Sequence, residues 1–283
     1  MGRNENVVVF KDTEKLVKAN EKIKKSVQNS TDNQKIILET DALKDINLNK
    51  YEEDAKVIVS TKRTFEAASY YKGLKVVVHN FASSTNPGGG VTRGSSAQEE
   101  CLCRCSGLYF SLSDPKMLDN FYLPHIKSHN PIHNDDIIFT PSVTVFKTDT
   151  STPELMKEDD WYDVDVITCS APNLRDRPSN SFNSGDGSKK ANISNSELLK
   201  IHEKRLRRIL DVAVLEKDEA IILGAFGCGA FLNNPEVVAK ATKNVIKDYL
   251  KAFKVIEFAI YCNPTRDSIN YTIFKETLKD LTK

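Results

Sequence analysis

Two adjacent glutamates, Glu99 and Glu100, follow three consecutive glycines, Gly88, Gly89 and Gly90, at the distance of one short loop. A row of glycines costs folding entropy and is useful mainly where another group must approach the backbone closely. Two neighbouring carboxyl groups disfavour double ionisation, so one of them keeps its proton closer to neutral pH and can act as an acid. The alternative is an acidic first helical turn that the helix dipole stabilises. The glycine run favours the catalytic interpretation.

A second glycine-rich turn, LGAFGCGAFLNNP, covers residues 223–235. Each turn follows a predicted strand, at the carboxyl edge where open α/β sheets bind ligands. Bare backbone amides at such a turn can hold a phosphate without any lysine. Neither turn matches the phosphate loop that ends in Gly-Lys-Ser/Thr or the dinucleotide fingerprint with its distant acid. Plain turn chemistry is the alternative for each turn taken alone.

The elements that must position these residues alternate along the chain. Helices are expected over residues 13–28, 64–71, 97–112, 196–216 and 234–253 and at the C-terminus, and strands over KIIL, KVIVS, 73–81, 135–146 (as a pair), 162–172, 219–226 and 254–262. Strands separated by helices predict an α/β sheet with helices on both faces. The Ser-, Asn- and Gly-rich stretch 176–196 predicts a flexible loop or insertion.

Composition excludes some classes of protein. Forty basic and 39 acidic residues among 283 leave a formal net charge of +1, so no general attraction to nucleic acid or to an anionic membrane is expected. The first residues do not form a signal peptide, and no stretch is long enough to span a bilayer. Six cysteines, three of them crowded into CLCRC, predict reduced thiols and an intracellular, cytoplasmic location, with a nuclear one open in a eukaryote.

Other residues with reactive side chains are assigned structural roles. His125, His129 and His133 have a spacing that metal ligands on a helix could use, but Pro131 interrupts that helix, so we expect a polar loop and no metal. The cysteines of CLCRC are expected to pack as small hydrophobic residues. Cys228 lacks a histidine in its motif that could activate it as a nucleophile. No cofactor is expected.

The ordered motifs resemble the bacterial-type poly(ADP-ribose) glycohydrolases, a branch of the macrodomain superfamily. Their signature is three glycines, six to eight residues and then Gln-Glu-Glu; here VTRGSSA separates Gly90 from Gln98, Glu99 and Glu100. The motifs TKRTFEAASYY, NFASSTNPGGG, AQEECLCRCSGLY, IIFTPSVTVF, VDVITCSAPN and ILGAFGCGAFLNNP follow in the family's order. The resemblance implies a macrodomain-like mixed sheet flanked by helices, with a helical accessory segment at 1–60 and a catalytic domain at 61–283.

The resemblance also implies residue roles. Glu100 would be the catalytic acid, Glu99 would orient ribose hydroxyls, and Asn80 would contact the distal ribose. The triple-glycine loop would lie against the diphosphate and distal ribose, and Gln98 belongs to the same signature. The second loop would wrap the diphosphate, with its last aromatic packed on the ribose; it comprises Gly224, Ala225, Phe226, Gly227, Cys228, Gly229, Ala230 and Phe231.

The expected reaction is hydrolysis of a ribose–ribose O-glycosidic bond through an oxocarbenium-like transition state. Glycosidases usually place two carboxyl groups on opposite sides of the sugar, which adjacent residues do not readily do. One acid and one positioning group are therefore assigned. Expected partners are ADP-ribose, poly(ADP-ribose) or ADP-ribosylated macromolecules, bound by a monomer that releases ADP-ribose from the polymer terminus. Alternatives are removal of single ADP-ribose units from protein or nucleic acid, and an ADP-ribose reader without turnover.

Overall fold

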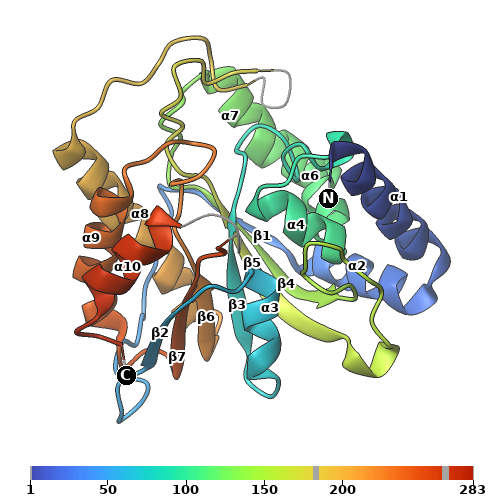
Figure 1. Ribbon diagram of the computed structural model, residues 1–283, viewed down its shortest axis with the longest axis horizontal. Coiled ribbons are helices and arrows are strands. Elements are labelled where there is room, and N and C mark those ends of the chain that lie inside the picture. Colours follow the sequence, from blue (N-terminus) through green and yellow to red (C-terminus); the bar gives the residue numbers. More distant parts are fainter. Residues whose placement is uncertain (1, 181–184, 263–267, 283) are drawn as a thin grey trace.

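The computed structural model describes residues 2–180, 185–262 and 268–282 (Figure 1). Its strands are β1 (Lys35–Ile37), β2 (Lys56–Ser60), β3 (Val76–Phe81), β4 (Ile137–Val145), β5 (Tyr162–Cys169), β6 (Ala220–Leu223) and β7 (Val255–Ala259). The helices are α1 (Arg3–Ala19), α2 (Glu21–Asn33), α3 (Thr64–Ala68), α4 (Gln98–Cys105), α5 (Leu108–Leu112), α6 (Pro115–Met117), α7 (Leu123–Ser128), α8 (Asn195–Leu215), α9 (Pro235–Ile246) and α10 (Ile269–Leu278). Single-turn segments η1 to η5 lie between them.

The strands form one mixed sheet in the order β1-β4-β5-β3-β6-β7-β2. Strands β5, β3, β6, β7 and β2 run parallel to one another, whereas β4 is antiparallel both to β5 and to the edge strand β1. The carboxyl ends of the five parallel strands therefore meet at one edge. Because β3 and β6 are adjacent, the two glycine-rich loops that follow them lie next to each other at this edge.

Side chains of the central strand pack on both faces of the sheet. Val77 belongs to the core cluster shared with α8, α9 and α10, whereas Val76 and Val78 belong to the cluster shared with α1, α3, α4 and α5. A strand covered on both faces is uniformly apolar, which explains the VVV run. Figure 1 shows the two helical layers on either side of the sheet. The predicted mixed α/β sheet flanked by helices is confirmed.

Three predicted elements have other boundaries. Residues 13–28 are not one helix, because Asn20 has extended backbone and its side chain caps a second helix by accepting from the N–H of Lys22 and Ile23. The expected helix over 97–112 is broken where Ser106 is extended. Residues 135–146 form one strand with a register shift between Thr140 and Val143 instead of two strands.

The first 60 residues contribute to the sheet as well as to the helical layer. β1 and β2 are its two edge strands, so this segment is not only helical. Helix α1 lies against α4: the Thr13 hydroxyl donates to the Arg104 carbonyl over 2.6 Å, and the Asn6 amide donates to the Gly94 carbonyl over 3.0 Å. The buried Lys147 ammonium donates to the Val9 carbonyl over 3.1 Å. The division at residue 60 stays a prediction.

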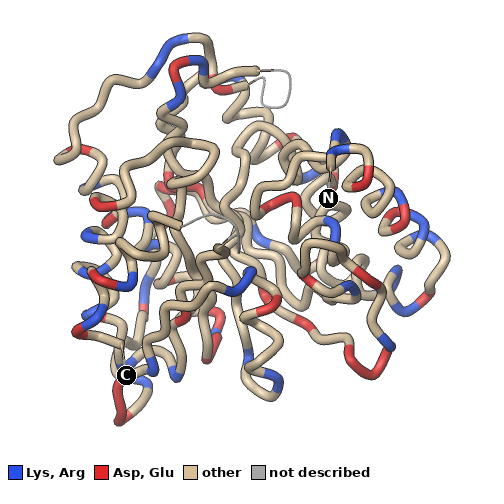
Figure 2. The backbone as a smooth tube through the Cα atoms, in the orientation of Figure 1, with Lys and Arg blue, Asp and Glu red and all other residues tan. Residues whose placement is uncertain are grey.

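Charges are distributed without a single-sign face. Figure 2 shows basic and acidic residues interspersed along the backbone of the helices and loops. Among the described helices, none combines the length and the hydrophobicity needed to cross a membrane. An anionic ligand must therefore be recognised by local geometry and not by a general field.

Removal of the Phe10 side chain tests whether α1 is an integral part of the fold. Phe10 is 1% exposed and packs edge-on against Tyr109 with ring centroids 5.0 Å apart. We expect Phe10→Ala to lower the free energy of unfolding by about 3–5 kcal/mol in urea denaturation. Val8→Ala, at a residue on the same helix that is 66% exposed, should change it by less than about 0.5 kcal/mol. A loss below about 1 kcal/mol for Phe10→Ala would show instead that α1 is dispensable.

Candidate active site

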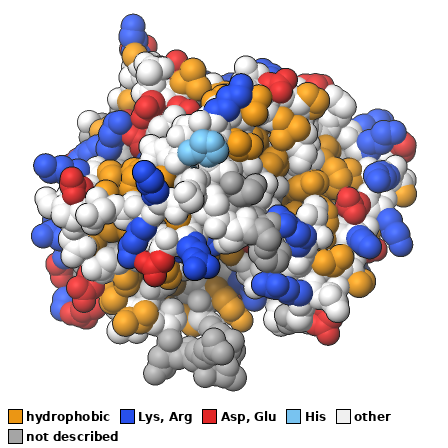
Figure 3. All heavy atoms as spheres, turned by 90° about the horizontal axis from the view of Figure 1, so that it is seen from above, with side chains coloured by type: hydrophobic (Ala, Val, Ile, Leu, Met, Phe, Trp, Pro, Cys, Tyr) orange, Lys and Arg blue, Asp and Glu red, His pale blue; other side chains and the backbone are white. Residues whose placement is uncertain are grey.

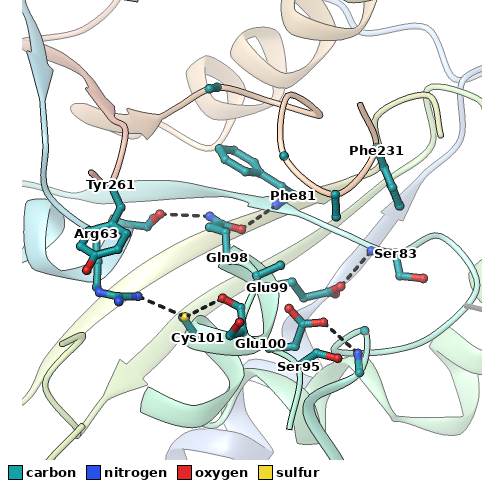
Figure 4. Close-up of a pocket in the computed structure, with 18 of the residues that line it drawn as sticks. Arg63, Phe81, Ser83, Ser95, Gln98, Glu99, Glu100, Cys101, Phe231 and Tyr261 are labelled. Atoms are coloured by element: carbon teal, nitrogen blue, oxygen red, sulfur yellow. Dashed lines mark hydrogen bonds between the residues drawn. The ribbon is translucent and has the colours of Figure 1, made fainter. Parts of the chain in front are cut away.

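A cavity of about 780 Å³ opens at the carboxyl edge of the sheet. Its walls come from both glycine-rich loops, the first turn of α4, the segments that follow β2, β5 and β7, and the start of α1. Figure 3 looks onto the loops at the upper end of Figure 1 and shows hydrophobic, basic and acidic side chains intermixed on that face. The close-up in Figure 4 shows Glu99 and Glu100 side by side between Phe231 on one side and Arg63 and Tyr261 on the other.

Glu99 is held through both of its carboxylate oxygens. Oε2 accepts from the Ser83 N–H over 2.8 Å (Figure 4), and Oε1 accepts from the Asn80 amide over 3.3 Å. The backbone of Gly88 donates a further hydrogen bond to the carboxylate. Glu99 is 3% exposed, so these donors replace the water that the carboxylate loses on burial. A group fixed in this way can position a substrate hydroxyl.

Glu100 is held through one oxygen only. Oε1 accepts from the Gly90 N–H over 2.9 Å, whereas Oε2 has no hydrogen-bond partner among the described residues. A buried polar atom without a partner is costly, and such atoms occur where a ligand or a reaction supplies the missing contact. Of the two carboxyl groups, Glu100 is thus the one with an oxygen whose hydrogen-bonding capacity is still unused within the described residues.

Burial sets the protonation of this pair. Desolvation raises the pKa of Glu100 from its usual value, and desolvation together with the charge of Glu100 raises the pKa of Glu99 well above 4.5. The N–H donors from Ser83 and Gly90 oppose these shifts by stabilising the charged forms. The pair therefore retains a proton at pH values where an exposed glutamate is ionised, as a general acid requires.

The glycine run is explained by the carboxylates that approach it. Gly89 has φ +59°, and a Cβ there would lie 2.5 Å from Oε1 of Glu100 and 3.1 Å from Oε2 of Glu99. The N–H groups of this loop are already engaged: Gly88 and Gly90 donate to the glutamates, and Gly89 donates to the Asn86 carbonyl. These amides hold the acids, so a diphosphate would meet only the Cα surface of this loop.

The second loop carries the unengaged amides. No acceptor within the described residues takes the N–H groups of Gly229, Ala230 and Phe231, which are consecutive and line the cavity. Consecutive backbone N–H groups make a concave anion-binding surface. Phe231 is half-buried and lies between the Arg175 guanidinium, 5.5 Å from its ring centroid, and the His133 ring. Phe231 therefore lines the cavity and also packs against the edge of the core cluster.

The predicted site residues divide between the cavity wall and the layer behind it. On the wall lie Gly89, Gly90, Gln98, Glu99, Glu100, Ala225, Phe226, Gly227, Gly229, Ala230 and Phe231. Asn80, Gly88, Gly224 and Cys228 lie behind the wall. Asn80 is buried and donates to Glu99, so the structure places it under the acid pair. Burial raises the pKa of Cys228 to about 12, which leaves it a thiol and not a nucleophile.

Several wall residues were not identified from the sequence. Arg63 stacks on the Tyr261 ring at 3.9 Å, and its guanidinium approaches the Cys101 sulfur at 3.4 Å. Asp149 lies on the same part of the wall, and burial raises its pKa to about 6. Arg175 reaches the cavity from the segment after β5. These residues come from separate loops, and no local motif signals that they converge.

The three histidines are not brought together. His125 bonds to Asn134 over 2.7 Å, and His133 lies 3.1 Å from Asp186, whereas His129 ends α7 in a left-handed conformation. Within the described residues no cluster of three or more His, Cys, Asp or Glu side chains could hold a metal ion. The six cysteines are free thiols. The groups that the fold does bring together at the cavity are a pair of buried carboxyls and a loop of consecutive backbone amides.

The fold and site define a hydrolase for an anionic ligand, and comparison with known proteins supplies the family. The model of the microbial-type PARG catalytic domain matches residues 4–148, just over half of the chain. The chain therefore belongs to this family of poly(ADP-ribose) glycohydrolases, which are glycosidases that hydrolyse poly(ADP-ribose). The match begins within α1, inside the segment predicted to be accessory. Among curated proteins, none matches the chain.

Solved structures agree with this assignment. The poly(ADP-ribose) glycohydrolase of Deinococcus radiodurans in complex with ADP-ribose is 28% identical in sequence. The superposition covers 91% of this chain and 98% of the Deinococcus chain, with a TM-score of 0.75. The enzyme of Thermomonospora curvata bound to the inhibitor ADP-HPD is 24% identical, with 97% and 99% coverage and a TM-score of 0.79. The macrodomain-like fold predicted from the sequence is confirmed.

The Glu100→Gln variant tests the acid. Glutamine keeps the shape and accepts the Gly90 hydrogen bond but cannot donate a proton to a leaving oxygen. We expect turnover of polymer to fall by about 10²- to 10⁴-fold with near-normal affinity for ADP-ribose. Glu99→Gln should weaken ADP-ribose binding as well as turnover, because it loses a positioning group. Unchanged turnover in Glu100→Gln would contradict the assignment.

The same variants give a pH signature. A carboxyl with a raised pKa binds more protons in the folded than in the unfolded chain, so it lowers stability as pH rises above its unfolded value of 4.5. Glu100→Gln should therefore melt at a higher temperature than the unmodified protein at pH 7, whereas in Glu99→Gln the new NH₂ group faces an N–H donor and offsets this gain. The difference should vanish below about pH 4, where the carboxyls are protonated in both states. Calorimetry across this range measures it.

Alanine substitutions at two glycines of the second loop, Gly227 and Gly229, separate the effect of backbone strain from that of an added methyl group. Gly227 has φ +76°, and a Cβ there would lie 2.6 Å from the Ala171 Cβ, whereas a Cβ on Gly229 would meet nothing within 4 Å. We expect Gly227→Ala to weaken ADP-ribose binding by at least about tenfold in calorimetry, since the strained loop must shift its amides. Gly229→Ala adds a methyl group without backbone strain, so its effect on affinity should be smaller than that of Gly227→Ala. An affinity equal to that of the unmodified protein in both folded variants would remove the loop from the site.

Proposed function

We propose that the protein cleaves poly(ADP-ribose) from the terminus of the chain, with Glu100 as general acid. The observation that carries the proposal is the buried, unpartnered oxygen of Glu100, a residue that lines the same cavity as Gly229, Ala230 and Phe231, whose amides are unengaged within the described residues. The amides bind the diphosphate of the terminal unit, which places the scissile glycosidic oxygen beside an acid that retains its proton. The complex of the Deinococcus relative with ADP-ribose supports this ligand.

The roles of the two glutamates follow from their surroundings. Oε2 of Glu100 protonates the departing ribose oxygen as the glycosidic bond breaks, which stabilises the leaving group in an oxocarbenium-like transition state. Glu99, fixed by Ser83 and Asn80, accepts hydrogen bonds from ribose hydroxyls. Because both carboxyls approach from one side, water attacks from the side of the diphosphate and the glycine-rich loops. Water addition then yields free ADP-ribose and a polymer shorter by one unit.

The opposite end of the cavity suits the base. Tyr261 is 44% exposed, and the Arg63 guanidinium lies 3.9 Å from its ring centroid. An aromatic ring beside a cation offers a stacking surface for a purine.

Three further statements remain proposals. Free thiols at all six cysteines support a reducing, cytoplasmic location. The monomeric state and the division of the chain at residue 60 stay predictions from the sequence. A reader without turnover would need the loops but not the acid, so the buried Glu100 argues for hydrolysis.

The mode of cutting can be read from early products. The protein is incubated with labelled, automodified polymer and, in parallel, with mono-ADP-ribosylated substrates, and the products are separated by chromatography. We expect monomeric ADP-ribose from the first time points and little release from the mono-modified substrates. Free oligomers of intermediate length before ADP-ribose would show internal cleavage. Release from mono-modified substrates alone would favour the mono-ADP-ribosyl hydrolase.

A further inference from the structure

Asn233 ties the second loop to the body of the protein. Its side-chain amide lies 2.7 Å from the Pro172 carbonyl, 3.1 Å from the Gly227 carbonyl and 3.2 Å from the Phe231 carbonyl. One NH₂ group thus faces three backbone oxygens from two different loops. Asn233 is 2% exposed and does not line the cavity, so it does not touch a ligand bound there.

The side chain of His202 fixes the orientation of the Asn233 amide. Because the amide nitrogen faces the carbonyls, Oδ1 faces His202 and accepts a hydrogen bond from its Nε2 over 2.8 Å. The imidazole must therefore carry its proton on Nε2. Burial lowers the pKa of His202 to about 4, so the neutral ring persists at neutral pH. His202 is 3% exposed and belongs to α8, a helix of 21 residues that gives the contact a rigid support.

These contacts close the loop into a ring. The Asn233 backbone N–H also donates to the Gly227 carbonyl over 3.0 Å, so residue 233 binds residue 227 through both main chain and side chain. Leu232 adopts a left-handed conformation, with φ +58°, which is uncommon for leucine and turns the chain back beneath the loop. The carbonyls of Gly227 and Phe231 are thereby drawn inward, while the amides of Gly229 to Phe231 remain unengaged.

We propose that Asn233, oriented by His202, is a positioning residue that holds the second loop with its consecutive amides directed at the substrate diphosphate. The inference rests on the proposed function, since that function assigns the diphosphate to these amides. Loss of the Asn233 amide removes three contacts that fasten the loop, while the Gly227 and Phe231 carbonyls keep their backbone donors, the Asn233 and Leu174 N–H groups. The loop is then held less firmly and must be ordered further when ligand binds. The substitution should therefore weaken substrate binding and leave the rate of the chemical step nearly unchanged, because Glu99 and Glu100 lie on a different element.

The test compares two substitutions at one residue with a control at its neighbour. Asn233→Ala removes the amide, and Asn233→Asp keeps the oxygen that faces His202 but cannot donate to the carbonyls. Asn234→Ala is the control, because Asn234 caps α9 by accepting from the Glu236 N–H over 3.0 Å and has no side-chain contact with the loop carbonyls in the described residues. We expect both Asn233 variants to raise the Kd for ADP-ribose and the KM for polymer by about 10- to 100-fold, with kcat within about threefold. Asn234→Ala should lower Tm and leave Kd unchanged.

Inorganic pyrophosphate separates this proposal from the proposed function. It probes the loop alone, while ADP-ribose probes the whole cavity, and both are titrated by calorimetry. If unmodified protein binds both ligands and the folded Asn233 variants bind them equally well, the positioning role is wrong while the function stands. If unmodified protein binds neither, the proposed function fails and the positioning role with it. Should neither Asn233 variant fold, His202→Phe replaces them: a rise in Kd of about threefold or more supports the proposal, and an unchanged Kd overturns it.

Discussion

The site depends on two carboxyl groups, those of Glu99 and Glu100, that are buried close together despite the desolvation cost and the repulsion between their charges. Backbone N–H groups make this possible: Ser83 donates to Glu99, and Gly90 donates to Glu100. Each donor offsets part of the desolvation cost, and neither brings a positive charge that would hold the acids fully ionised. The result is a carboxyl pair with raised pKa values, one oxygen of which has no hydrogen-bond partner among the described residues.

Because the acids must be held by backbone N–H groups, the two glycine-rich loops have different roles. The loop after β3 uses its amides to hold the acids, and side chains at Gly89 would collide with them. The loop after β6 keeps three consecutive amides unengaged and is fastened from beneath by Asn233. Because β3 and β6 are neighbouring parallel strands, the acid-holding loop and the anion-binding loop face each other across one cavity. The fold thus brings an acid and an anion site together with no lysine in either loop.

Helix α1 joins the site to the N-terminal part of the chain. It contacts α4, the helix that begins with the acid pair, through Thr13 and Arg104, and its first turn lines the cavity. The backbone of Arg3 leaves no room for a side chain on Gly94, since a Cβ there would lie 2.1 Å from the Arg3 carbonyl oxygen. The loop between the glycines and the glutamates is therefore shaped by a helix that lies about 90 residues earlier in the sequence.

The sequence by itself determined the α/β class, the two loops and the acid pair, because each is written in local patterns: apolar runs, consecutive glycines, adjacent glutamates. It did not reveal the break at Asn20, where a side-chain cap overrides a continuous helical period. Nor did it reveal which residues meet around the cavity. Arg63, Tyr261 and Asn233 acquire their roles from neighbours that are distant in the chain, and such contacts are decided only when parallel strands bring their carboxyl ends to one edge.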